Sequence, residues 1–221
     1  MNRRHALSVL VLFALLPALA ALSGCSKAYY GTMEKFGVHK RDIMVDRVKE
    51  ARDSQTEAKE QFKSALDEFI EVMRVPESSL ATQYKKLNAE YERCRSKAKE
   101  VHKRIDSVES VSEALFAEWK NELKDYSSDT LRRDSERKLE ATRRQYEQLI
   151  TAMKRAESKI QPVLTVFHDQ VLYLKHNLNA QAVASLQGEM LSLERNVGQL
   201  VREMEESIRE ADSFIRNLQQ S

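Results

Sequence analysis

Glycine and proline are scarce in this chain of 221 residues, which contains five glycines and three prolines. The whole stretch between Gly37 and Gly188 has no glycine. A glycine-rich loop that cradles phosphate is therefore excluded there, and with it the common nucleotide-binding motifs. Strand-like alternation bounded by turns is also missing. The stretch is instead rich in Ala, Glu, Lys, Arg, Leu and Gln, which is the composition of long helices.

Acidic residues are absent from the first 25 positions, where Arg3 and Arg4 precede an uncharged apolar stretch. This layout is typical of a secretory signal peptide. A transmembrane helix is not expected, because the stretch is short and Pro17 interrupts it. The residues LSGC at positions 22–25 resemble the lipobox of bacterial lipoproteins.

The lipobox resemblance implies that residues 1–24 are removed and that Cys25 carries acyl chains such as palmitate, which anchor the chain in a membrane. Ser26 in place of aspartate implies the outer membrane rather than the inner one, with the protein facing the periplasm. An ordinary signal peptide, in which Cys25 has no special role, is the alternative.

An excess of charge is lacking once the predicted signal is removed. The chain has 36 basic and 34 acidic residues, and the signal contains two of the basic ones, Arg3 and Arg4. Binding to nucleic acid then loses its main electrostatic support, so we expect no such partner.

Cysteine is scarce too. With Cys25 acylated only Cys94 remains, so no disulfide can form within the mature chain, although an intermolecular one stays open. Cys94 lies in an apolar helical seam, which favours a small core residue over a reactive thiol.

Apolar residues recur at alternating spacings of three and four, the heptad pattern of packed helices. The pattern predicts a first helix over about residues 40–74, a turn and helix cap at Ser127-Ser128-Asp129, and breaks near 75 and 178. Gln55 is the only polar member of the first seam. The four seams run from Met44 to Val72, from Leu80 to Tyr126, from Leu139 to Leu174 and from Val183 to Leu218.

Each seam is flanked by a third apolar position, as at Leu66, Phe116, Leu164 and Ile215. A stripe of this width needs several neighbours, so the pattern predicts an all-α fold, a long antiparallel helical bundle of about four helices rather than a two-stranded coiled coil.

The predicted organisation is a signal over 1–24, a lipidated tether over 25–40 and a single elongated bundle domain over 41–221. Residues 131–159 are mainly basic and 189–212 mainly acidic, so the third and fourth helices are expected to pack side by side.

The sequence offers little for chemistry. His168 and His176 are eight residues apart, and no Glu-x-x-His motif accompanies them, so the pattern does not favour a metal pair. No local signature of a nucleophile and its base is present. We therefore predict no metal, no cofactor and no enzyme activity. Pro162 lies on the polar side of a seam that continues in phase past it, which favours a kinked helix over a boundary.

Two segments are candidates for binding anionic surfaces. Residues 93–104 hold six basic side chains against one acidic, but these are scattered around the helix, which favours an ordinary solvated face. Residues 26–42 are suited to a membrane interface, and a tether that folds back on the end of the bundle is an equal alternative. The candidate interface side chains in the second segment are Tyr29, Tyr30, Phe36, Lys40 and Arg41.

The residues YYG at 29–31 and EKFGVHKRDI at 34–43, followed by the helical run over 46–69, resemble uncharacterised bacterial lipoproteins grouped as domain of unknown function 2959. The resemblance extends over the mature chain, although only its amino-terminal motif is distinctive. It implies no activity, and it suggests that YYG and KFGVHKRD are important to the family.

Two functions are compatible with these observations. One is a structural spacer or adaptor, anchored in the outer membrane by its lipid and presenting polar faces to envelope proteins or the cell wall, with homo-oligomers left open. The other is a lipid-binding or membrane-remodelling module whose amphipathic helices lie on a bilayer.

Overall fold

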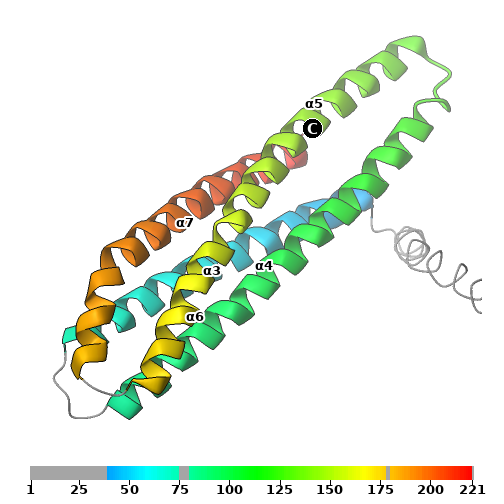
Figure 1. Cartoon of the computed structure of the whole chain (residues 1–221). Helices are drawn as coiled ribbons and strands as arrows, with labels where there is room; N and C mark the ends of the chain where they lie inside the picture. The colour runs from blue at the N-terminus through cyan, green and yellow to red at the C-terminus, as the bar shows by residue number, and fades with distance from the viewer. Residues whose placement is uncertain (1–38, 75–79, 178–179, 221) are drawn as a thin grey trace, which may run out of the picture.

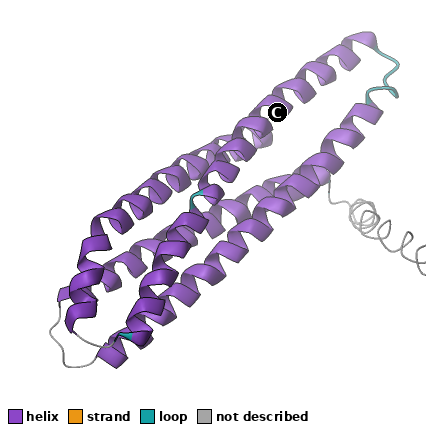
Figure 2. Cartoon of the chain, viewed as in Figure 1, coloured by secondary structure: helices purple, strands orange, loops and turns teal. Residues whose placement is uncertain are grey.

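The computed structural model describes residues 39–74, 80–177 and 180–220, and helices make up almost all of them (Figure 1, Figure 2). No strand occurs in these three ranges, which confirms the predicted all-α class. The predicted breaks near 75 and 178 fall outside them. The helices are α3 (Lys40–Arg74), α4 (Leu80–Glu122), α5 (Asp129–Ser158), α6 (Ile160–His176) and α7 (Ala180–Gln220).

The helices form an antiparallel bundle of four rods, because α5 and α6 follow one another along a single line (Figure 1). α3 packs along α4 and α7, and the α5–α6 rod packs along the same two helices. Each rod therefore has two neighbours, and the bundle closes within one chain. This confirms the predicted architecture and the predicted pairing of the third and fourth rods.

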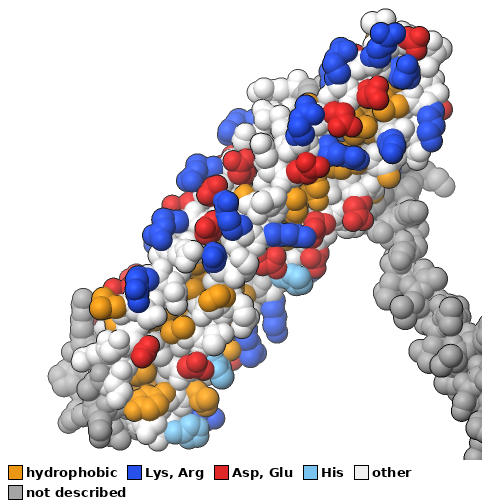
Figure 3. Space-filling model, turned by 45° about the horizontal axis from the view of Figure 1, so that its top comes forward, with side chains coloured by type: hydrophobic (Ala, Val, Ile, Leu, Met, Phe, Trp, Pro, Cys, Tyr) orange, Lys and Arg blue, Asp and Glu red, His pale blue; other side chains and the backbone are white. Residues whose placement is uncertain are grey.

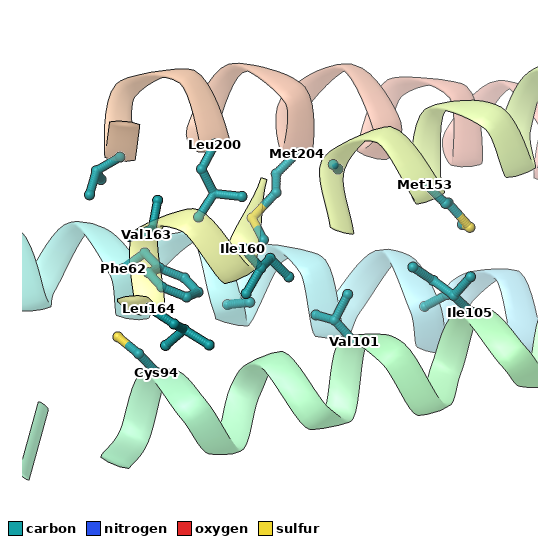
Figure 4. Close-up of a cluster of buried hydrophobic side chains, with 14 of the residues drawn as sticks. Phe62, Cys94, Val101, Ile105, Met153, Ile160, Val163, Leu164, Leu200 and Met204 are labelled. Carbon is teal, nitrogen blue, oxygen red and sulfur yellow. The ribbon is translucent and has the colours of Figure 1, made fainter. Parts of the chain in front are cut away.

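The core follows the predicted seams closely. Every member of the first seam, from Met44 to Val72, is buried. The rings of Phe62 and Phe69 meet Phe167 across the bundle, with centroids 6.4 and 6.5 Å apart. Figure 4 shows part of the core near Phe62, in which side chains from all four rods point toward one another. The side chain of Val183, at the start of the fourth seam, lies outside the described residues.

The third rod is divided at Lys159, a residue whose backbone stays in the α region at φ −85° and ψ −12°. Pro162 explains the division, because it has no N–H to donate to the carbonyl of Ser158 and its ring crowds that carbonyl. Ile160 and Val163 are both buried, so the apolar face continues in phase. The sequence favours a kink over a boundary, and the structure interrupts the helix at this one residue while the rod continues past it.

The second seam was predicted to run to Tyr126, which is beyond the end of α4. α4 stops at Glu122 in a tight turn, where the N–H of Asp125 donates to the carbonyl of Glu122 over 3.0 Å. Glu122 and Tyr126, the last two predicted members, are exposed. Ser128 caps α5 by accepting a hydrogen bond from the N–H of Leu131, as predicted.

α4 and α5 extend beyond the ends of α3 and α7 as a two-helix projection (Figure 1). Its base is held by Trp119, whose indole N–H donates to the hydroxyl of Ser135 over 2.8 Å. We call residues 119–138 the hairpin and the remainder of the bundle the body. The hairpin has only two helices, so its side chains have fewer neighbours than those of the body.

Candidate functional surfaces

The start of α3 is fixed at the base of the hairpin. Lys40 is buried, and its ammonium group donates to Glu118 Oε1 on α4 over 2.7 Å. Arg41 Nε donates to the carbonyl of Leu218 near the end of α7 over 3.0 Å. The structure thus engages these two predicted interface residues in contacts within the bundle. The other predicted site residues, Cys25, Tyr29, Tyr30 and Phe36, lie outside the described residues.

The basic window over 93–104 is engaged by carboxylates of its own and neighbouring helices. Arg104 donates to Glu50 on α3 over 2.7 Å and to Glu100 over 2.6 Å. Lys97 pairs with Glu57 over 2.6 Å. These ion pairs agree with the interpretation of this window as an ordinary solvated face.

The contact between the basic and acidic rods is carried by Arg155 of α5, which reaches Glu206 and Glu203 of α7 at 2.6 Å each. The hydrogen bonds that Arg155 donates to Glu206 and Glu203 raise the pKa of Arg155, so the guanidinium stays charged. His102 of α4 similarly bonds Glu157 of α5 over 2.7 Å, and this carboxylate raises the pKa of His102.

Cys94 lies in the core against Leu164 (Figure 4), and its thiol donates to the carbonyl of Gln61 over 3.7 Å. Burial raises the pKa of Cys94 to about 12. The thiol is therefore neutral and shielded at ordinary pH, which supports the interpretation as a small core residue.

His168 and His176, which the sequence pattern does not favour as a metal pair, lie at the surface. His168 faces the ring of Tyr91, with centroids 5.4 Å apart. In the part of the chain that the structure describes, no group of three or more His, Cys, Asp or Glu side chains is placed to hold a metal ion.

None of the helices within residues 39–74, 80–177 and 180–220 combines the length and apolar character that a bilayer span requires.

The tip of the hairpin exposes two apolar side chains, one in the connection between α4 and α5 and one in the first turn of α5. Tyr126 is 42% exposed and Leu131 is 59% exposed. Basic side chains gather around this end of the molecule (Figure 3). Sequence reasoning missed this surface, because it treated Tyr126 as a buried seam residue and did not compare the lengths of the helices.

A second apolar surface lies on α6 and α7 at the opposite end of the molecule, where Figure 3 shows several hydrophobic side chains. Leu172 and Tyr173 are exposed there, and Leu191 is 70% exposed. A shallow groove beside them is lined by Val166, Gln170, Tyr173 and Leu186, among others. We call the exposed Leu172, Tyr173 and Leu191, together with this groove, the far-end surface.

Gln170 adds a polar feature to the far-end surface. Its side chain is 4% exposed, and neither its amide nitrogen nor its amide oxygen has a hydrogen-bond partner. A buried amide in this state costs free energy, because it has lost water without gaining another partner.

The comparisons with known proteins give a family but no characterised relative. The model of a protein family of unknown function, DUF2959, matches residues 29–218. No curated protein and no solved structure matches the chain.

Proposed function

The chain belongs to the DUF2959 family, and from that premise we propose that it is a membrane-anchored spacer or adaptor of the bacterial cell envelope. The observation that supports this most is the separation of two features along the molecule. The chain enters the bundle beside the hairpin, through Lys40 and Arg41, whereas the far-end surface lies at the other end.

The anchor of this proposal is Cys25. The LSGC motif at 22–25 supports acylation of its thiol, and two or more acyl chains give stable attachment to a bilayer. Because the tether leads from Cys25 to His39, the hairpin end of the bundle faces the membrane in this arrangement.

The length of the body then sets the reach of the far-end surface. α3 has 35 residues and is therefore about 52 Å long. The exposed side chains of Leu172, Tyr173 and Leu191 are held at the end of this span. Exposed apolar clusters of this kind mark contacts with other proteins, so an envelope protein is the proposed partner.

The second function considered from the sequence, with amphipathic helices opened onto a bilayer, has less support. Opening the bundle would expose the seam side chains of all rods, including Phe62 and Met204, which are fully buried. A closed bundle that binds partners through its ends keeps these apolar side chains buried, so it avoids the free-energy cost of exposing them.

Photo-crosslinking in cells tests the partner. A photoreactive residue replaces Lys86 or Leu191 toward the far end, Gln199 on the body and Arg133 on the hairpin, one at a time. We expect a discrete heavier adduct with another protein from the far-end positions and none from Gln199. Adducts with no second protein at any position would contradict the adaptor.

Mass spectrometry of the mature amino terminus tests the anchor separately. The expected result is a first peptide that begins at Cys25 and carries acyl chains. A matched Cys25→Ser variant is expected to leave the membrane fraction. An unmodified Cys25 in the mature protein would contradict the proposed function.

A further inference from the structure

We propose that the tip of the hairpin contacts the surface of the same bilayer that holds the anchor. In this arrangement the exposed side chains of Tyr126 and Leu131 enter the headgroup region, and nearby basic side chains bind lipid phosphates. The orientation rests on the proposed function, because it requires an anchor at Cys25. The contact itself depends only on residues of the hairpin.

The first step is the direction in which the hairpin points. The ion pair between Lys40 and Glu118 places the start of α3 against the last turns of α4. The bond from Arg41 to the carbonyl of Leu218 places the end of α7 at the same level. The hairpin continues past this level, so it extends beyond the end of the bundle at which α3 begins (Figure 1).

The tether is long enough to let the tip reach the membrane. The segment from Cys25 to His39 spans at most about 50 Å when fully extended. The part of α5 from Asp129 to Lys138 is about 15 Å long. A shorter tether would hold the bundle end close to the bilayer, and the hairpin would be the first part to meet it.

The second step is the chemistry of the tip. Tyr126 lies in the connection between α4 and α5, Leu131 lies in the first turn of α5, and both are exposed. A tyrosine ring with its hydroxyl and a leucine side chain are suited to the boundary between headgroups and acyl chains. Two apolar groups separated by a polar turn form a small contact, which a soft lipid surface accommodates more readily than a rigid protein interface does.

The charges of the tip have both signs. Lys124 donates to the side-chain oxygen of Asn121 over 3.2 Å, and Arg132 pairs with Asp129 over 3.2 Å. The apolar pair therefore supplies most of the binding, and the cations add preference for anionic lipid. The charged side chains of the hairpin are the basic Lys120, Lys124, Arg132, Arg133, Arg137 and Lys138 and the acidic Glu122, Asp125, Asp129, Asp134 and Glu136.

Site-specific labelling of the acylated full-length mature protein tests the contact. Cys94 is buried with a raised pKa, so an added cysteine is the reactive thiol. Leu131→Cys carries an environment-sensitive fluorophore at the tip, and Leu191→Cys carries it at the far end as a matched control. Vesicles of phosphatidylethanolamine and phosphatidylglycerol contain a lipid with a headgroup quencher.

We expect the lipid quencher to reduce the fluorescence of the label at 131 and to leave the label at 191 unchanged. Equal quenching at both positions, or none at 131, would overturn the proposal. A label at 131 that is shielded only after envelope proteins are added would mean that a protein covers the tip, which also overturns it.

Vesicle binding by a form without the lipid anchor tests the contact of the tip independently of the anchor. In the Cys25→Ser form, Tyr126→Ser with Leu131→Ser is expected to lower partition into the same vesicles about tenfold. Leu172→Ser with Leu191→Ser is the control and is expected to have no effect. Replacing Arg133 with glutamine is expected to lower partition up to fivefold, equal to about 1 kcal/mol.

The two possible failures are distinguishable. If Cys25 is not acylated but the tip variants still lose vesicle binding, the proposed function fails and the contact stands. If Cys25 is acylated and the tip variants bind vesicles as the parent does, the contact fails and the anchor stands.

Discussion

The body and the hairpin share one heptad pattern but differ in burial. In the body every rod has two neighbours, and seam residues such as Phe62, Val101 and Leu200 have no exposed surface. In the hairpin the same seam continues, yet Trp119 is half-buried and Tyr126 is exposed. The comparison shows that the number of neighbouring helices, rather than the pattern alone, determines whether a seam residue is buried.

The difference has consequences for stability. Phe116, near the base of the hairpin, packs against two side chains of α5, the ring of Tyr146 and the guanidinium of Arg143. Elements with few buried apolar contacts open locally at lower free energy than the rest of a domain. The hairpin is therefore expected to be the less stable region.

The largest effect is expected from a cavity in the body. Phe62→Ala removes a fully buried ring that contacts Phe167, and we expect the free energy of unfolding to fall by about 3–5 kcal/mol. Denaturant titration measures the change. Leu131→Ala on the hairpin is the control and should change it by less than about 0.5 kcal/mol. Similar losses for both variants would break the distinction between the regions.

A cavity at the base of the hairpin is expected to act locally. Leu139→Ala removes a buried side chain next to the hairpin, and we expect a loss of about 2–3 kcal/mol, at the low end for a buried leucine. Amide exchange should become faster in residues 119–138 and stay unchanged in α3. Faster exchange throughout the molecule would show that the hairpin and the body unfold as one unit.

A polar pair in the body offers a gain in stability. Ser207 donates to Gln55 Oε1 over 2.7 Å, while the amide nitrogen of Gln55 is buried without a partner. Gln55→Leu combined with Ser207→Ala is expected to stabilise the protein by about 1 kcal/mol, because it removes that unpaired donor. We also expect looser helix register, seen as broadened amide resonances. A loss of stability would instead assign the pair a net favourable role.

The ion pair at the junction between the body and the hairpin is expected to have a smaller effect on the free energy of unfolding. The pair between Lys40 and Glu118 is partly exposed on the glutamate side. Lys40→Gln should lower the free energy of unfolding by about 0.5–1 kcal/mol. A double-mutant cycle with Glu118→Gln isolates the pair, and a coupling energy of zero would show that it does not fix the start of α3.

The smallest effect is expected from His102, which links α4 to α5 within the body. The carboxylate of Glu157 raises its pKa in the folded state, so its stabilising contribution is complete below the unfolded value and is lost as pH rises through the folded one. Both groups of the pair are partly exposed, so solvent and salt weaken the effect. Unfolding of the parent and of His102→Gln should differ at about pH 6 and agree at about pH 8. A difference at about pH 8 alone would contradict this assignment.

Much of the fold could be predicted from the sequence, because burial in a bundle follows the heptad. The seams identified the core from Met44 to Val72 and most of the other three. The division at Lys159 was missed because the apolar phase continues across it, whereas Pro162 breaks the backbone ladder. The partner of Gln55 was missed because pairing between rods depends on their register.

The functional surfaces were harder to predict for a physical reason. The hairpin exists because α4 has 43 residues and α3 has 35, so α4 extends beyond the end of α3. That difference in length is present in the sequence and is the signal that could have revealed the hairpin. The far-end surface depends on which side chains are left uncovered after packing, as at Leu191, and no local motif reports this.

Native-state amide hydrogen exchange across the whole chain tests the distinction between the two regions most directly. We predict the slowest exchange in the body, at residues 101–111 of α4 and 149–157 of α5, and much faster exchange in the hairpin at residues 119–122 and 129–138. Equal protection of the two regions in the isolated protein would contradict the account, because it would mean that the hairpin is covered as fully as the body.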